Sequence, residues 1–167
     1  MNFNIILIII AAGGIAVDQI TKLIVASNMH LNDTLPIIKN VLHITYIKNE
    51  GAAFGILSNH RWIFMSVSAV AIVALCVYLF RFSKDTRLMK TGMALIISGG
   101  IGNMIDRIFL GYVVDMIDFR LINFYIFNVA DACVSVGAAV LILGIVLNEI
   151  KTIKAKKAGE QNDCGGN

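Results

Sequence analysis

Four long apolar runs limit what this chain of 167 residues can fold into more than any other feature. The runs cover about residues 3–25, 62–80, 88–107 and 128–147. A bilayer core about 30 Å thick is spanned by about 20 predominantly apolar residues in a helix. Every run has about that length, and the second contains no charged residue. The sequence therefore predicts a membrane protein with four transmembrane helices.

The composition supports this prediction and excludes several classes of protein. Hydrophobic residues make up 57% of the chain and charged residues 15%, whereas a soluble domain has about 25% charged residues. The three cysteines have no metal-ligand spacing, and an odd number does not form a disulfide framework. We therefore expect neither a disordered chain, nor a nucleic-acid-binding domain, nor a disulfide-stapled secreted module. The prediction is one integral membrane domain over residues 1–150, followed by a basic cytoplasmic tail over residues 151–167.

The distribution of lysine and arginine predicts which way the helices cross the membrane, because short cytoplasmic loops carry an excess of these residues. They are concentrated after the second run and in the tail, at Arg81, Lys84, Arg87, Lys90, Lys151, Lys154, Lys156 and Lys157. This predicts cytoplasmic termini and outer loops at residues 28–61 and 108–127. The opening MNFN has no positive charge, so we expect the first run to be a retained helix and not a cleaved signal peptide. The last residues, AGEQNDCGGN, are expected to be disordered.

Both predicted outer loops carry patterns of their own. In the first loop, residues 42–46 (LHITY) alternate apolar and polar side chains, which is typical of a strand. A turn is expected near residues 49–51, and the loop is predicted to form a small sheet on the outer membrane surface. The segment 49–55 (NEGAAFG) suits the approach of an extended peptide backbone, although an ordinary turn has a similar composition. The second loop is rich in aromatic residues, so we expect it to dip into the headgroup layer.

The chain has only 11 acidic residues, and several aspartates gather at the outer ends of the predicted spans. They are Asp18, Asp106, Asp115, Asp118 and Asp131. A carboxylate at the centre of a spanning helix costs about 2.5–3.5 kcal/mol, so such residues indicate a functional site by default. For Asp118 we prefer the simpler interpretation that the side chain reaches water at the outer edge.

Asp115 and Asp131 are the strongest candidates for chemistry. Asp115 lies in the apolar string YVVDMI, and Asp131 lies about one turn into the fourth run, on the same helix face as Asn128. The link between them can bring the two carboxylates together. Two carboxylates at close range do not both ionise easily, so one keeps a proton. The ionised carboxylate can then activate water, while the protonated one polarises a scissile carbonyl group.

The segment 99–107 (GGIGNMIDR) has both a functional and a structural interpretation. It places Asn103 and Arg107 on one helix face, and its glycines permit close helix packing. Arg107 is expected to pair with Asp106 or with Asp18. The alternative is a buried polar network that only holds the helices together.

In their order along the chain, these polar segments resemble the lipoprotein signal peptidase family, also called signal peptidase II, which consists of membrane aspartic proteases. The matching segments are 18–22 (DQITK), 49–54 (NEGAAF), 102–107 (GNMIDR), 113–117 (VVDMI) and 127–131 (FNVAD). One such segment alone is a weak signal, but five in the family's order on a four-span frame are specific. The resemblance covers about residues 5–147.

The resemblance implies a membrane all-α fold with a small β element, in which four transmembrane helices carry an extracytoplasmic β-cradle. It implies that Asp115 and Asp131 are a catalytic dyad, which cleaves bacterial prolipoproteins just before a cysteine that carries a diacylglyceryl group. The residues implied to bind substrate or to support the site are Asp18, Lys22, Asn49, Gly51, Asn103, Arg107, Asn128 and Ala130. It further implies a monomer in the lipid of the bacterial cytoplasmic membrane with its site near the outer face. Such an enzyme needs no metal or organic cofactor and is inhibited by globomycin.

Two other classes of function stay open at this stage. One is a small proton- or cation-coupled transporter that uses intramembrane aspartates, although the paired halves common in transporters are not found in the sequence. The other is a non-enzymatic membrane scaffold. Catalysis by histidine is not expected, because His30, His43 and His60 all lie in the first predicted outer loop and no HExxH motif is present.

Overall fold

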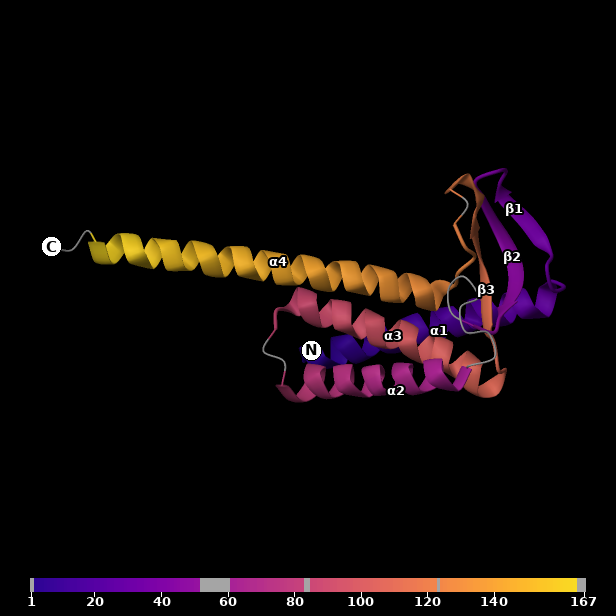
Figure 1. Ribbon diagram of the computed structural model, residues 1–167, viewed down its shortest axis with the longest axis horizontal. Helices are drawn as coiled ribbons and strands as arrows, with labels where there is room; N and C mark the ends of the chain where they lie inside the picture. Colours follow the sequence, from indigo (N-terminus) through magenta and orange to yellow (C-terminus); the bar gives the residue numbers. More distant parts are fainter. Residues whose placement is uncertain (1, 52–60, 83–84, 123, 165–167) are drawn as a thin grey trace.

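The structure is a computed structural model that describes residues 2–51, 61–82, 85–122 and 124–164. The elements in order are α1 (Phe3–Asn28), β1 (Thr34–Ile38), β2 (Leu42–Asn49), α2 (Arg61–Val77), a π-helical turn (Tyr78–Phe82), α3 (Arg87–Phe109), β3 (Val113–Phe119), a 3-10 turn (Arg120–Ile122) and α4 (Val129–Cys164). The helices run alongside one another, and the strands lie together at one end of them (Figure 1). Both chain ends lie toward the other end.

Within the described residues, three helices are long and apolar enough to cross a membrane: α1, α3 and the part of α4 over Val129–Lys156. Many large apolar side chains on α1 and α4 face away from the protein, which is typical of helices solvated by lipid. The structure thus agrees with the prediction of a helical membrane protein with a small β element. The second predicted span corresponds to a shorter apolar helix, Met65–Arg81, and its crossing of the membrane stays a prediction.

The three strands form one antiparallel sheet in the order β1-β2-β3. The strand predicted over residues 42–46 is confirmed and continues to Asn49, where the chain bends. Its buried side chains are those of His43, Thr45 and Tyr46. A bulge between Ile44 and Ile47 interrupts the pairing with β3, which changes the face that each side chain occupies along the strand.

The second predicted outer loop contains a strand that the sequence analysis did not anticipate. We expected residues 108–127 to be an aromatic loop in the interface, but Val113–Phe119 of this segment is β3. The strand has aspartates on two positions and is buried along most of its length, so it lacks the alternation that identifies a half-buried strand. Phe119, at the end of β3, stacks on Phe127 with ring centroids 6.1 Å apart, and the expected dip of this segment into the headgroup layer stays a prediction.

The fourth helix is longer than predicted. The expectation of a disordered end is wrong for residues 158–164, which continue α4 to Cys164. The segment after the apolar run contains alanine, lysine, glutamate and glutamine, which have high helix propensity, and no proline. Propensity is therefore sufficient to continue a helix that the membrane run has already nucleated.

Two apolar clusters hold the elements together. One lies between α1, α3 and the π-helical turn and is centred on the buried residues Leu7, Leu79, Met93, Ala94 and Ile97. The other joins the sheet to the end of α1 and contains Val25, Tyr46, Val114 and Met116. Since Val114 and Met116 flank Asp115 in β3, this second cluster fixes the strand that carries one of the predicted catalytic residues.

Candidate active site

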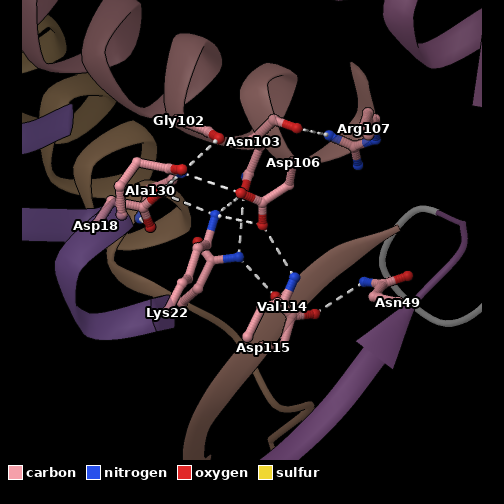
Figure 2. A network of polar contacts seen from close by, with 12 residues as sticks. Asp18, Lys22, Asn49, Gly102, Asn103, Asp106, Arg107, Val114, Asp115 and Ala130 are labelled. Atoms are coloured by element: carbon pink, nitrogen blue, oxygen red, sulfur yellow. Dashed lines mark hydrogen bonds and ion pairs between the residues drawn. The ribbon is translucent and has the colours of Figure 1, made fainter. Parts of the chain in front are cut away.

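The structure brings all of the predicted site residues to the end of the helices where the sheet lies. Asp18 and Lys22 come from α1, Asn49 and Gly51 from the end of β2, Asn103 and Arg107 from α3, Asp115 from β3, and Asn128, Ala130 and Asp131 from the start of α4. Figure 2 shows most of them in one polar network. The remaining residues of the motif after Gly51, 52–55, lie outside the described residues.

Asp115 is buried and accepts hydrogen bonds from two amide side chains. Asn128 Nδ2 lies 2.6 Å from Asp115 Oδ1, and Asn49 Nδ2 lies 2.9 Å from Oδ2. The carboxyl is only 1% exposed, and its removal from water raises its pKa to about 6. The hydrogen bonds from Asn49 and Asn128 oppose this rise in pKa, while the nearby charge of Asp131 adds to it.

Asp131 lies in the first turn of α4 and takes part in the cap of that helix. Its Oδ2 accepts a hydrogen bond from Asn128 N at 3.2 Å, and Asn128 Oδ1 accepts one from Asp131 N at 2.9 Å. This reciprocal pairing has the geometry of a capping box. The other oxygen, Asp131 Oδ1, accepts a hydrogen bond from Asn103 Nδ2 at 2.8 Å. Helix capping therefore orients one of the two candidate carboxylates.

Asn128 connects the two aspartates, because its side chain donates to Asp115 and its backbone donates to Asp131. The same Nδ2 group also lies 3.1 Å from Asn103 Oδ1. Asn128 is fully buried, so no water competes for its hydrogen bonds. The two amides of Asn103 and Asn128 thus fix the position of one carboxylate relative to the other.

Beneath the two amides lies an ion cluster that consists of Asp18, Lys22 and Asp106. Lys22 Nζ is 2.8 Å from Asp18 Oδ2, 3.0 Å from Asp106 Oδ2 and 3.0 Å from Asn103 Oδ1. All three charged residues are at most 3% exposed. The expectation that Asp106 or Asp18 pairs with Arg107 is therefore replaced by a different arrangement, in which Lys22 is the cation that binds both.

The two carboxylates of this cluster also hold the backbone next to each candidate aspartate. Asp18 Oδ1 accepts a hydrogen bond from Ala130 N at 2.8 Å, and Asp106 Oδ2 accepts one from Val114 N at 3.0 Å. Ala130 precedes Asp131, and Val114 precedes Asp115. The cluster thus anchors β3 and the start of α4 to the same buried lysine, which sets the distance between this strand and this helix.

Glycine in α3 is what allows the helices to approach so closely. A Cβ atom on Gly102 would lie 2.7 Å from Asp18 Oδ2 and 3.1 Å from Ala130 Cβ. A Cβ atom on Gly99 would collide with the carbonyl oxygen of Ala130. The predicted role of these glycines in helix packing is therefore confirmed, and both lie against the residues that hold the site.

Arg107 lies beside the network and connects α3 to the end of β2. Its guanidinium donates to the carbonyl oxygens of Asn103 and Gly51, both at 3.4 Å. Gly51 N in turn donates to Asn49 Oδ1 at 3.0 Å, so that the amide of Asn49 is held with its Nδ2 toward Asp115. Arg107 therefore supports the bend that presents Asn49.

Asp118 differs from what the sequence predicted. We expected it to reach water, but it is only 7% exposed. Its Oδ2 accepts hydrogen bonds from Thr45 Oγ1 at 2.7 Å and from Arg120 Nε at 2.9 Å. Burial acts to raise the pKa of Asp118, but these hydrogen bonds and the charge of Arg120 outweigh it and hold the pKa below its ordinary value.

Gln19 is the network residue that sequence reasoning missed. Its Nε2 group lies within 3.2 Å of Asp18 Oδ2, Asp106 Oδ1 and the carbonyl oxygen of Gly102. Its place next to Asp18 in the DQITK segment was the only signal. The hydrophobic pattern of α1 does not show which side of the helix this polar residue faces. Its contacts could therefore not be inferred without the packing of α1 on α3.

An apolar cavity of about 490 Å³ lies beside the site, between α1, the sheet and the start of α4. Its walls include Val25, Met29, Leu35, Ile44, Met116 and Val129. Across the described part of the chain, no three histidine, cysteine or carboxylate side chains are grouped so that they could hold a metal ion. The site thus combines the buried carboxyl of Asp115, the partly buried carboxyl of Asp131, neutral amide donors and adjoining apolar space.

Comparison with known proteins gives a consistent result. The signal peptidase (SPase) II family matches residues 10–147. The lipoprotein signal peptidase of Clostridioides difficile (strain 630) is 46% identical over 147 residues, which are 88% of this chain and 97% of that protein. The lipoprotein signal peptidase of Brevibacillus brevis (strain 47) is 41% identical over 140 residues, which are 84% of this chain and 94% of that protein.

Solved structures agree with the sequence comparison. A bacterial membrane enzyme determined by the in meso method at 2.3 Å resolution matches with a TM-score of 0.81 at 33% identity, over 86% of this chain and 88% of that one. A second such structure, at 1.9 Å resolution, matches with a TM-score of 0.77 at 34% identity, over 83% and 91% of the two chains.

The fold and these likenesses place the protein among the membrane enzymes. The chain belongs to the signal peptidase II family, and it is therefore a protease that acts in lipoprotein processing. This assignment takes the place of the transporter and scaffold alternatives.

Proposed function

We propose that the protein is an aspartic endopeptidase that removes the signal peptide of bacterial prolipoproteins, cutting just before the cysteine that carries a diacylglyceryl group. Asp115 and Asp131 are the proposed catalytic pair. The observation that carries the proposal is that one buried residue, Asn128, hydrogen-bonds both carboxylates. Two carboxyl groups held in this way, with Asp115 buried and Asp131 partly buried, can bind one water molecule between a general base and a general acid.

The pair is proposed to work with one shared proton. Because the pKa of Asp115 is raised to about 6, a proton is retained there more readily than on an exposed aspartate. The ionised carboxylate takes a proton from water as the water oxygen attacks the scissile carbonyl carbon. The protonated carboxyl gives its proton to the carbonyl oxygen. When the tetrahedral intermediate collapses, the C–N bond breaks and a proton passes to the leaving nitrogen.

The residues around the pair have distinct proposed roles. Asn49, Asn103 and Asn128 orient the carboxylates through neutral amide groups, and Arg107 with Gly51 holds the bend that presents Asn49. Neutral donors fix the geometry without the stabilisation of a negative charge that a cation would provide. The ion cluster of Asp18, Lys22 and Asp106 does not contact the carboxyl groups of the pair by hydrogen bonds. It positions them by holding the backbone of Val114 and Ala130, the residues that precede them.

The orientation in the membrane is also part of the proposal. Both chain ends lie away from the sheet (Figure 1), and the lysines and arginines of the tail and of the link before α3 belong to the same end. With four spans, this supports a multi-pass protein of the bacterial cytoplasmic membrane with both termini in the cytoplasm. Asp115 and Asp131 then lie near the outer face, where a lipid-modified cysteine in the outer leaflet would place the scissile bond.

The apolar cavity beside the site suits this class of substrate. It borders Met116, which follows Asp115, and Val129, which lies two residues before Asp131. A diacylglyceryl group needs apolar surroundings close to the reacting bond. From the resemblance to the signal peptidase II family we further expect cleavage by a monomer without metal or organic cofactor, and inhibition by globomycin through occupation of the substrate channel.

The decisive experiment is cleavage of a diacylglyceryl-modified precursor peptide by the purified protein in detergent. Asp115→Asn and Asp131→Asn should each lower kcat by about 10²–10⁴-fold, the range for loss of a general acid or base. Asp118→Asn is the matched control, because it changes an aspartate of the same strand that contacts neither member of the pair, and it should retain activity. Cleavage that survives both Asp115→Asn and Asp131→Asn would overturn the dyad.

A further inference from the structure

The last part of α4 extends beyond the rest of the protein. Gly144 packs against Met89, near the residue at which α3 begins, so α4 leaves its neighbours at about this level. Figure 1 shows α4 continuing far past the ends of α2 and α3. Past Gly144, no other helix of the described residues runs beside α4 (Figure 1), and in a membrane protein lipid and water would surround this extension.

The side chains on this extension form an apolar stripe with lysines beside it. Val146, Ile150 and Ile153 are 48%, 43% and 51% exposed, and their spacing of four and three residues puts them on one face. Lys151, Lys154 and Lys156 are exposed on the same two turns. An apolar stripe flanked by lysines is typical of helices at a membrane interface that contains anionic lipid.

The length of α4 places these lysines at a defined depth. At about 1.5 Å per residue, the 20 residues from Asp131 to Lys151 span about 30 Å, and the 25 residues to Lys156 span about 38 Å. The hydrocarbon core of a bilayer is about 30 Å thick, and about 40–45 Å with its headgroup layers. When Asp131 lies at one edge of the core, the lysines therefore lie in the headgroup layer of the opposite leaflet.

We propose that Lys151, Lys154 and Lys156 bind the phosphate groups of anionic phospholipids, while Ile150 and Ile153 contact the acyl chains next to them. Ammonium groups at headgroup level complement an anionic leaflet, and the flexible lysine stems allow them to follow it.

The proposed contact fixes how deeply α4 sits in the bilayer. Since α4 is a continuous helix, a fixed depth at its lysine end also fixes the height of Asp131 at its other end. The lipid contact rests on the length, charge and exposure of α4 and on the proposed position of Asp131 at the edge of the membrane core. The consequence for Asp131 rests on the proposed function, and its test is separate.

The lipid contact is tested with a fluorophore on Ile153→Cys, in a full-length protein whose three native cysteines are replaced by alanine. The protein is placed in nanodiscs of phosphatidylcholine alone, or with phosphatidylglycerol added. We expect a quencher attached to the lipid to quench the fluorophore several-fold more strongly in the discs that contain phosphatidylglycerol. Changing the three lysines to glutamine should abolish the difference, whereas changing them to arginine should preserve it. Equal quenching in both discs, or a difference that survives the glutamine variant, overturns the proposal. Quenching that changes with the number of protein copies in a disc, and not with its lipid, also overturns the proposal and indicates contact between two copies.

The consequence for Asp131 is tested by cleavage of the precursor peptide in the same discs. Phosphatidylglycerol should raise cleavage by the unchanged protein several-fold and leave the glutamine variant unaffected, while both proteins should cleave equally in detergent. Equal stimulation of both proteins would overturn the link between depth and activity. If no protein cleaves in any medium, the proposed function fails, and the fluorescence experiment still decides the lipid contact.

Discussion

Two aspartates of the same strand, Asp115 and Asp118, show how the surroundings of a carboxyl decide its chemistry. Both are buried, at 1% and 7% exposure, yet the pKa of Asp115 is raised to about 6 while the pKa of Asp118 is lowered. Asp118 is in contact with the guanidinium of Arg120 at 2.9 Å, whereas Asp115 is held by the neutral amides of Asn49 and Asn128. Neutral donors fix a carboxyl in place without stabilising its charge as strongly as a cation does.

A buried cation is nevertheless close to Asp115. Lys22 is directed to Asp18, Asp106 and the side-chain oxygen of Asn103, which use its three donors. Its charge lowers the pKa of Asp115 only through space. The site thus uses a lysine for architecture and leaves the proposed catalytic carboxyl of Asp115 with a pKa raised to about 6.

The largest effect is expected on stability, when the cation beside each group of aspartates is replaced by a neutral residue. These cations are Lys22, which binds Asp18 and Asp106, and Arg120, which binds Asp118. Lys22→Met leaves Asp18 and Asp106 buried without a counter-charge, which should destabilise the protein by about 3–5 kcal/mol. Arg120→Gln removes a cation that is 41% exposed, so water screens the loss and the effect should stay under about 1 kcal/mol. The free energy of unfolding and the thermal midpoint in detergent measure both. Equal losses of unfolding free energy in the two variants would contradict the view that the buried Lys22 stabilises the protein more than the exposed Arg120 does.

A smaller and more specific effect is expected on the pH dependence of cleavage. Asn49→Ala removes a hydrogen bond that lowers the pKa of Asp115, so that pKa should rise above about 6. A hydrogen bond to a charged group contributes about 1.5–3 kcal/mol, and one pH unit corresponds to about 1.4 kcal/mol. The limb of the kcat/KM profile that reports Asp115 should therefore move upward by about one to two pH units.

The matched control for this shift is Thr45→Val. It removes the corresponding hydrogen bond from Asp118, at 2.7 Å, and should leave the activity profile where it is. An unchanged limb in Asn49→Ala, or the same shift in Thr45→Val, would show that Asp115 is not the group that the profile reports.

The sequence predicted the partners of Asp115 better than those of Asp118. Asn49, Asn103 and Asn128 were named from the family's motifs, and the structure joins them to the two candidate aspartates. A motif carries this information because a polar residue within an apolar run has few alternative explanations. Asp118 has no such motif, and its burial depends on the pairing of β3 with β2, which brings it opposite His43.

The ion cluster shows the limit of the same reasoning. Asp106 and Arg107 are neighbours in the sequence, which suggested that they pair, but consecutive helix residues point in different directions. Asp106 faces Lys22 on α1, and Arg107 faces the carbonyl oxygen of Gly51. The packing of α1 on α3 decides which partner each of the two adjacent charges meets. The hydrophobic pattern of neither helix specifies how the two helices are rotated against each other.

The smallest effect concerns stability at low pH, and its sign separates the two aspartates. The pKa of Asp118 is lowered in the folded protein, so its contribution to stability is present above its unfolded value of about 3.9 and is lost as the pH falls through the folded value. Asp115 has a raised pKa, so the folded state binds a proton that the unfolded state has released, and its contribution to stability is lost as the pH rises from about 4 to about 6.

The contribution of Asp118 is tested with Arg120→Gln, which should have a lower thermal midpoint than the unchanged protein at pH 7. This difference between the two proteins should disappear at a pH low enough to protonate Asp118, and it should be smaller in high salt. The same substitution should leave the cleavage profile unchanged. A midpoint difference that grows on acidification would mean that Arg120 does not act through the ionised form of Asp118.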